Sequence, residues 1–442
     1  MNPIKLEQLN KDLNEYQGCK KHKVLRHALV NNSLLQVTTN QDDVKDYDFN
    51  FSINIKTLPA ANQKASGRCW IFAATNFLRE IIAKRCDLSS FELSQSYVAF
   101  YDRLEKVNYT LEAVIELLDK DYDDRTLSFI LMNGIGDGGQ WDMFVNIVNK
   151  YGLCPKNAFP ETATSSGTRE TNSLINFNIR KFASVAKELY QSQGLEAVRE
   201  LKDRVLKDVY FLLIDCYGVP PEKFDFEYTD KDDNYHIDTG FTPLSFKEKY
   251  IGDTLDQYVS IINAPTKDKA FNKTYTVKYL GNVAGGKVVT HLNLPMERLK
   301  KLILAQLKDN TIVWFGSDVS FYGDRPLGIW DDHRFDTLTA FNLDWKMDKG
   351  ESLDYRASQM NHAMCITGVN LKDDRPTKWK IENSWGSDVA KAGYYIMSDT
   401  WFDQFVYQAV VNKKYLSEEE LKALKEEPIM LKPWDPMGSL AD

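Results

Sequence analysis

A cysteine at the start of a helical pattern constrains this chain more than any other feature. Cys69 lies in the segment 63–74, QKASGRCWIFAA, and the residues that follow it predict a helix over 69–85. A thiol on the first turn of a helix lies at the positive end of the macrodipole, which favours the nucleophilic thiolate. Gln63 carries an amide that can donate a hydrogen bond to a developing oxyanion. Cys69 is therefore the candidate nucleophile, and Gln63 with the backbone N–H of Cys69 forms the candidate oxyanion hole.

Two polar residues far downstream complete the candidate site. His362 lies in the segment 360–364, MNHAM, and Asn383 lies in the segment 382–386, ENSWG. An imidazole can take the thiol proton and return it to the leaving amine, and an asparagine amide can orient the imidazole. Cys, His and Asn, with a Gln before the Cys, form the working set of papain-like cysteine peptidases. Trp385 is placed to shield the bond between the imidazole and Asn383.

The spacing of these residues predicts an insertion. His362 follows Cys69 by 362 − 69 = 293 residues and Asn383 follows it by 383 − 69 = 314 residues. Papain-like chains usually show ~130–150 residues, so the excess of roughly 150 is the size of a domain. We expect an α+β fold of the papain type, with a helical half, a half built as a β-sheet or barrel, and an inserted helical domain between them.

Hydrophobic periodicity agrees with helices early and strands late in the chain. We expect helices from Ser94 as N-cap and over 110–118, 126–132, most of 172–217, 295–307 and 417–427. Strands are expected over 257–263, 273–280, 312–319, 363–369, 377–382 and 393–397. In the first 60 residues an amphipathic stretch, 6–16, precedes two short strand-like pieces at 34–38 and 49–53. The acidic, aromatic segment 220–240 is expected to be an exposed loop.

A glycine-rich segment, 133–141 (NGIGDGGQW), is expected to open a further helix. Gly138 and Gly139 lack side chains and so permit close approach of an extended peptide to the backbone. The segment lacks the Gly-Lys-Ser/Thr of a phosphate-binding loop. His362 and Cys365 form an H-x-x-C pair, but on a strand they face opposite sides, so we predict no metal and no cofactor.

The composition excludes several classes of protein. The 442 residues carry a net charge of −8, which disfavours a dedicated nucleic-acid binder. No apolar stretch approaches the ~18 residues of a membrane span, and the N-terminal segment lacks the apolar core of a signal peptide. Six cysteines are scattered with no CxxC pair, as expected for reduced thiols. We therefore expect a cytoplasmic protein that binds neither membranes nor nucleic acid.

The motifs together resemble the bleomycin hydrolase and bacterial aminopeptidase C family of papain-like peptidases. The resemblance covers nearly the whole chain and rests on the segments 62–70, 137–143, 360–364, 382–386 and 434–441 (WDPMGSLA). It implies a homohexameric barrel whose active sites face an internal cavity. It also implies that the C-terminal residues lie in the cleft of their own subunit, where a carboxylate meets the free amine of a peptide substrate and excludes a longer chain.

With this resemblance the sequence predicts six parts. They are an N-terminal extension packed on the catalytic core (1–60), a helical half with the nucleophile (61–160), an inserted, mostly helical domain (161–255), a strand pair or oligomerisation hook (256–295), a sheet half with His362 and Asn383 (296–415), and a C-terminal helix and tail entering the active-site cleft (416–442).

Two positions depart from the family pattern. Many relatives end at, or trim themselves to, the alanine that matches Ala441, whereas Asp442 follows it here. Either Asp442 is removed autocatalytically, or it shifts the stop by one residue. Asn361 precedes the histidine where relatives often carry threonine, and this position is expected to shape the rim of the pocket. The predicted substrate-binding residues are Gly138, Gly139, Asn361, Trp385, Ala441 and Asp442.

The function predicted from these residues is a cytosolic cysteine aminopeptidase that acts on peptides through a thioester acyl-enzyme. The alternative within the same fold is a thiol endopeptidase or oligopeptidase. A non-catalytic scaffold is a third reading, against which the complete set of Gln63, Cys69, His362 and Asn383 argues. Acyl transfer of the transglutaminase type uses Asp as its third member, and Asn383 favours peptide hydrolysis instead.

Overall fold

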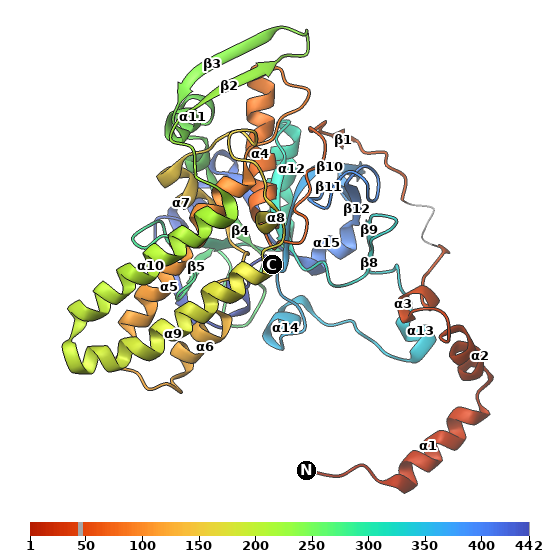
Figure 1. Cartoon of the computed structure of the whole chain (residues 1–442). Coiled ribbons are helices and arrows are strands. Elements are labelled where there is room, and N and C mark those ends of the chain that lie inside the picture. Colours follow the sequence, from red (N-terminus) through yellow and green to blue (C-terminus); the bar gives the residue numbers. More distant parts are fainter. Residues whose placement is uncertain (43–46, 442) are drawn as a thin grey trace.

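The chain folds as a helical half packed against a large mixed β-sheet (Figure 1). The computed structural model describes residues 1–42 and 47–441. The helical half consists of α4 (Cys69–Cys86), α5 (Gln95–Glu116), α6 (Arg125–Asn133) and α7 (Trp141–Tyr151). The predicted helix from 69 is confirmed, and Ser94 caps α5 by accepting a bond from the N–H of Tyr97. The helix expected over 110–118 is the second half of α5.

The sheet places the C-terminal half of the chain next to the helices. Within the described residues its strand order is β14-β5-β6-β4-β13-β7-β10-β11-β12-β9-β8, and β1 pairs with β10. The bounds are β1 (Ile53–Asn54), β4 (Tyr258–Ile262), β5 (Lys273–Val277), β6 (His291–Asn293), β7 (Val313–Ser317), β8 (Gly323–Asp324), β9 (Ile329–Trp330), β10 (His362–Lys372), β11 (Arg375–Glu382), β12 (Tyr394–Ser398), β13 (Val406–Asn412) and β14 (Ile429–Leu431). The six strands that we expected from residue 257 onward are confirmed, with ends that move by a few residues.

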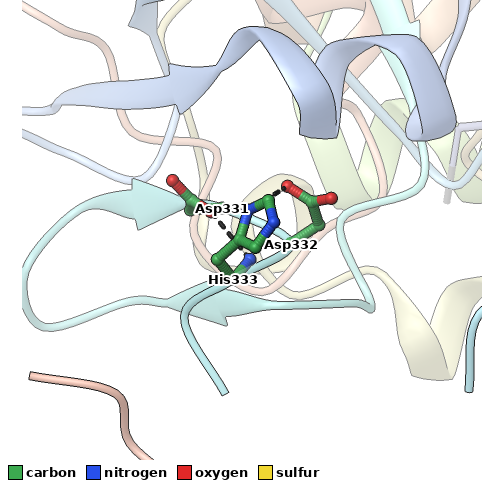
Figure 2. A group of neighbouring side chains, drawn as sticks. All are labelled: Asp331, Asp332 and His333. Atoms are coloured by element: carbon green, nitrogen blue, oxygen red, sulfur yellow. Dashed lines mark hydrogen bonds and ion pairs between the residues drawn. The ribbon is translucent and has the colours of Figure 1, made fainter. Parts of the chain in front are cut away.

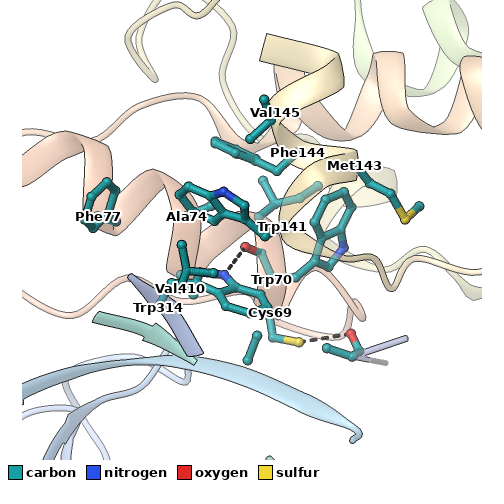
Figure 3. Close-up of a cluster of buried hydrophobic side chains, with 14 of the residues drawn as sticks. Cys69, Trp70, Ala74, Phe77, Trp141, Met143, Phe144, Val145, Trp314 and Val410 are labelled. Atoms are coloured by element: carbon teal, nitrogen blue, oxygen red, sulfur yellow. Dashed lines mark hydrogen bonds between the residues drawn. The ribbon is translucent and has the colours of Figure 1, made fainter. Parts of the chain in front are cut away.

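Aromatic side chains fill the layer between α4, α7 and the sheet (Figure 3). Trp70, Trp141 and Trp314 are each at most 1% exposed. The indole of Trp141 lies 6.1 Å from that of Trp314, and Trp314 Nε1 donates to the carbonyl of Trp70 over 3.1 Å. This contact fixes the start of α4 on β7, so the nucleophile segment is held by the core of the protein.

The segment between the two halves is mostly helical. It comprises α8 (Ala163–Ser166), α9 (Arg169–Gln193), α10 (Leu195–Tyr217), a hairpin of β2 (Phe224–Thr229) and β3 (Tyr235–Phe241), and α11 (Pro243–Tyr250). Figure 1 shows α9 and α10 side by side as a long pair. The expectation of a loop over 220–240 is wrong, because Phe224, Phe226 and Tyr228 alternate with acidic residues and turn one face of the hairpin onto α11.

The N-terminal region differs from the packed extension that we expected. None of the side chains of α1 (Leu6–Gly18) and α2 (Lys20–Ala28) is buried, and both helices lie away from the body in Figure 1. Packing on the body begins later, at the buried Thr38 and the bridge of Thr39 to Phe335, and continues with β1 on β10. The strand expected over 34–38 is wrong, because Ser33 forms a capping box that starts the short helix α3 (Leu34–Val37).

The remaining helices lie in the C-terminal part of the chain. They are α12 (Met296–Lys308), α13 (Thr337–Phe341), α14 (Lys349–Asp354), α15 (Asp399–Phe405) and α16 (Glu418–Ala423). The helices expected over 295–307 and 417–427 are confirmed, although α16 is shorter than expected. Among the residues that the structure describes, no helix combines the length and apolar character needed to cross a membrane.

Candidate active site

Cys69 is the first residue of α4, and its side chain is fully buried. Arg68, the N-cap residue, makes no side-chain capping bond, and its carbonyl accepts from the N–H groups of Ile71 and Phe72, each over 3.0 Å. The N-terminus of a helix favours a negative charge, and this position suits a thiol that acts as thiolate.

The C-terminal segment reaches this sulfur. Cys69 Sγ donates a hydrogen bond to the carbonyl oxygen of Ala441 over 3.0 Å (Figure 3). Ala441 is fully buried. The thiol proton is thus directed at a peptide carbonyl of the chain itself. Asp442, the last predicted binding residue, lies outside the described residues.

His362 and Asn383 come together from neighbouring strands. His362 begins β10, and Asn383 directly follows β11, its antiparallel partner. His362 Nε2 donates to Asn383 Oδ1 over 2.9 Å, which leaves Nδ1 as the basic nitrogen of the neutral ring. Trp385 stacks on the imidazole, with 4.9 Å between the ring centroids, and the guanidinium of Arg325 lies 4.9 Å from the centre of the Trp385 ring.

The surroundings of His362 favour the neutral imidazole. Burial lowers its pKa to about 4, against the opposing effect of the bond to Asn383. The charge of Arg325 lowers this pKa further. With the C-terminal segment seated in the cleft, the imidazole is therefore neutral at pH 7.

Gln63 is held next to the strand end that carries Asn383. Its Oε1 accepts a bond from the hydroxyl of Ser384 over 2.6 Å, and its backbone N–H donates to the Ser384 carbonyl over 2.8 Å. Its Nε2 donates to the carbonyl of Ser66 over 2.6 Å. A primary amide carries two hydrogens on nitrogen, and this bond uses one of them.

The glycine segment is clamped between the nucleophile segment and the inserted helices. Asp137 Oδ2 accepts from the N–H of Gly67 over 2.8 Å, and its Oδ1 accepts from Asn172 of α9 over 2.8 Å. Arg103 of α5 pairs with the same carboxylate. Burial opposes ionisation of Asp137, but the charge of Arg103 and these hydrogen bonds outweigh it and lower the pKa to about 2.

Two of the four glycines of this segment, Gly138 and Gly139, were predicted to bind substrate. A Cβ on Gly139 would lie 2.6 Å from the Trp70 ring, so only glycine fits there. Gly138 offers its carbonyl to Lys106 Nζ over 2.6 Å. The Trp70 indole in turn donates to the carbonyl of Asp137 over 2.7 Å.

Asn361 lies beside His362, but its amide is engaged elsewhere. Its Oδ1 accepts from the N–H of Val319 over 3.0 Å, and its Nδ2 donates to Asp318 and to Ser320, each over 2.7 Å. Asn361 therefore fixes the loop after β7. It also lines the cavity beside the C-terminal segment.

The C-terminal segment follows a defined path into the cleft. β14 pairs in parallel with β5, and a short 3-10 turn over Pro436–Gly438 follows. Gln140 Nε2 donates to the carbonyl of Ser439 over 2.9 Å, and the hydroxyl of Ser439 donates to the carbonyl of Met360 over 2.6 Å. Upstream, Trp434 lies under the guanidinium of Arg125 at 3.8 Å. A cavity of about 530 Å³ runs along this segment, between it and α5, α6 and residues 277–280.

A group of metal-ligating residue types lies elsewhere, in the turn after β9. Atoms of Asp331, Asp332 and His333 lie within 4.8 Å of one another (Figure 2). Asp331 already accepts from the N–H of His333, and Asp332 accepts from Thr400. In the H-x-x-C pair, the Cys365 thiol is engaged elsewhere, since it donates to the carbonyl of Ala73 on α4. Neither group argues for a metal site.

Sequence reasoning missed several residues that shape the site. Gln140 directly follows the glycine pair, and Ser384 stands between Asn383 and Trp385, so proximity to a motif was the available signal for both. Arg325 and Asn172 lie far from every motif in the sequence, and nothing local distinguishes them. Their roles depend on how the sheet half and the inserted helices fold back onto the site.

Comparisons with known proteins agree with this geometry. Residues 3–438 match the model of the Peptidase C1-like family. Aminopeptidase C of Lactobacillus delbrueckii subsp. lactis is 47% identical over 95% of this chain and 94% of its own length. Human bleomycin hydrolase is 40% identical over 87% of this chain and 86% of its own length. The crystal structure of PepW from Lactobacillus rhamnosis HN001 superposes with a TM-score of 0.97 at 45% identity and covers 99% of both chains.

Proposed function

This chain belongs to the Peptidase C1-like family, with the papain-like α+β fold and the cysteine aminopeptidase activity that this membership carries, and on that premise we propose how it works. It removes N-terminal residues from peptides through a thioester acyl-enzyme. Its C-terminal segment limits the cleft to one residue of the substrate. The observation that carries the proposal is the hydrogen bond from Cys69 Sγ to the Ala441 carbonyl, because it seats this segment over the nucleophile.

The proposed chemistry assigns one role to each candidate residue. Cys69 attacks the scissile carbonyl after Nδ1 of His362 takes its proton. The imidazolium then protonates the leaving amine, and water, activated by the neutral imidazole, hydrolyses the thioester. Asn383 and Trp385 hold the imidazole in position. Gln63 and the backbone N–H of Cys69 stabilise the oxyanion.

The substrate backbone follows the glycine segment in this proposal. Gly138 and Gly139 admit an extended peptide, and Asn361 shapes the rim of the pocket through the loop that it holds. The engagement of Ser439 by Gln140 and Met360 supports a cleft that is already filled beyond the first substrate position.

The position of Ala441 also supports self-processing. Its carbonyl lies where a scissile carbonyl would lie, and the bond that follows it joins Ala441 to Asp442. Cleavage of that bond would leave a carboxylate on Ala441. A carboxylate there can pair with the ammonium group of a peptide substrate. Mass spectrometry of the purified protein tests this step, because loss of Asp442 should depend on Cys69.

The central experiment compares a free-amine aminoacyl fluorogenic amide with its N-acetylated twin. The enzymes are the full chain, a variant truncated before Pro436, and Cys69→Ala. Cleavage of only the free amine by the full chain, and of both substrates by the truncated variant, is the expected result. Efficient cleavage of the blocked substrate by the full chain would instead favour the thiol endopeptidase. Activity in Cys69→Ala would contradict both functions.

Location and assembly complete the proposal. We propose the cytoplasm, since no disulfide joins any of the six cysteines within the described residues. We propose a homohexamer, with the exposed α1 and α2 as contacts between the chains. Light scattering after gel filtration should then give six times the 50.9 kDa of one chain.

A further inference from the structure

A buried group of charges joins three elements of the candidate site, and the proposed chemistry does not use it. The group, called here the Arg79 cluster, comprises Asn76, Arg79 and Glu80 of α4 and Glu382 at the end of β11. The side chains of Arg79 and Glu382 are 1% and 0% exposed. Glu382 directly precedes Asn383, and α4 is the helix that begins with Cys69.

The first contacts connect the helix to the strand. Arg79 Nη2 donates to Glu382 Oε1 over 2.7 Å, and Asn76 Nδ2 donates to the same oxygen over 2.9 Å. Glu382 is therefore bound at two points of α4, seven and ten residues after Cys69. Rotation or sliding of α4 relative to β11 would break both bonds.

The second contacts connect the helix to the segment that leads to Gln63. Arg79 Nη2 donates to the Leu58 carbonyl over 3.0 Å, and Glu80 Oε1 accepts from the Leu58 N–H over 3.0 Å. Five residues later the same segment contacts the end of β11, where the N–H of Gln63 donates to the carbonyl of Ser384. The same two side chains of α4 thus fix both backbone groups of Leu58.

A buried ion pair is a poor way to gain stability, because desolvation offsets most of its attraction. Apolar side chains would fill this space at similar or lower cost. The charged groups contribute directional hydrogen bonds, and each of these bonds fixes the position of one element relative to another. Displacement of reacting groups by about 1 Å can lower a rate by about 100-fold.

We propose that the Arg79 cluster is a positioning element that holds Cys69, Asn383 and Gln63 in register for catalysis. The proposal rests on the proposed function of these three residues. Asn76, Arg79, Glu80 and Glu382 are positioning residues, since none of them contacts the Cys69 sulfur or the imidazole of His362 in the described contacts.

The test uses Glu382→Gln in the full chain, which keeps the shape of the side chain and removes its charge. We expect kcat for the free-amine substrate to fall about 10- to 100-fold with KM nearly unchanged. We also expect the pH midpoint for alkylation of Cys69 by iodoacetamide to move, since the thiol and imidazole are displaced. Leu213→Ala is the control, because Leu213 is fully buried in α10 and its loss destabilises the protein away from the cluster.

The outcomes separate a positioning role from a structural one. If Glu382→Gln and Leu213→Ala lose similar stability and both keep kcat and the pH midpoint, the proposal is overturned. If Glu382→Gln does not fold, Asn76→Ser takes its place, because it removes only one donor to Glu382. The proposal then requires a lower kcat and a shifted pH midpoint of Cys69 alkylation in Asn76→Ser. Wild-type values of both in Asn76→Ser would overturn the proposal. Activity in Cys69→Ala would refute the proposed function instead of this inference.

Discussion

Cys69 and Ala441 are 372 residues apart in the sequence, yet the sulfur of one donates a 3.0 Å hydrogen bond to the carbonyl of the other. The nucleophile is thereby covered by the chain's own C-terminal segment. Both residues are fully buried. The reactivity of the thiol in this state should differ from its reactivity in an open cleft.

Truncation before Pro436 should make Cys69 more reactive at neutral pH. Removal of the segment exposes His362 to water, so its pKa should rise from about 4 toward its ordinary 6.5 and favour the thiolate–imidazolium pair. We expect alkylation of Cys69 by iodoacetamide at pH 6 to speed up by about 10-fold or more, since one pKa unit corresponds to tenfold. Alkylation rates measured across a range of pH separate the change in pKa from easier access of the reagent to Cys69. Easier access alone would raise the rate but leave the pH midpoint of alkylation unchanged. The Cys69→Ser form of the truncated chain gives the background from the other thiols.

Gln140→Leu should loosen the C-terminal segment without changing the chemistry. The substitution removes the bond to the Ser439 carbonyl, worth about 1 kcal/mol. We expect the ratio of kcat/KM for N-acetylated over free-amine substrate to rise about fivefold, as that energy implies. Gln359→Leu is the matched control, because Gln359 lines the same cavity and its described hydrogen bond comes from its backbone. An equal rise in both variants would argue against a specific role for Gln140.

Asp137→Asn should destabilise the protein by about 3–5 kcal/mol, because it leaves the buried Arg103 without its counter-charge. Denaturant unfolding at pH 7 measures this loss. The double variant Asp137→Asn with Arg103→Met should be markedly more stable than the single variant. A loss below about 1 kcal/mol in Asp137→Asn would show that the ion pair contributes little.

Glu80→Gln should change how stability depends on pH. Burial raises the pKa of Glu80 to about 7 against the opposing charge of Arg79, whereas the unfolded chain titrates near 4.5. The folded chain therefore holds a proton that the unfolded chain has lost, and the stability gained below pH 4.5 disappears as the pH rises through 7. Between pH 5 and pH 8 we expect wild type to lose about 2 kcal/mol more than Glu80→Gln, after allowance for partial exposure. Glu15→Gln, at an exposed position of α1, is the matched control for the substitution itself.

Local signals in the sequence were sufficient for much of the fold. The apolar run after Cys69 predicted α4, Ser94 predicted the start of α5, alternation predicted β5, and the apolar run 312–319 predicted β7. The β2–β3 hairpin was missed because its acidic residues hid the alternation of Phe224, Phe226 and Tyr228. The exposure of α1 was missed because an amphipathic pattern does not say whether its apolar face has a partner within the same chain.

The sequence likewise identified some residues of the candidate site and missed others. Cys69, His362 and Asn383 stood in recognisable motifs, and the structure brings His362 and Asn383 within hydrogen-bonding distance. The contact between Arg79 and Glu382 joins residues 303 positions apart, and neither residue has a local pattern that marks it. Pairings of this kind follow from the packing of α4 on the sheet, which periodicity alone does not specify.

The parallel pairing of β14 with β5 fixes how many residues separate the sheet from the end of the chain that reaches Cys69. Leu431 is fixed opposite Val277, and Ala441 lies 441 − 431 = 10 residues further along the chain. The connecting residues are held in turn by Lys269 on Asp435 and by the turn at Pro436–Gly438. The strand register and the length of these ten residues, called here the ruler, therefore determine which backbone carbonyl contacts the Cys69 sulfur. One residue added or removed within the ruler would bring a different carbonyl to the sulfur, while every side chain of the catalytic set stayed the same.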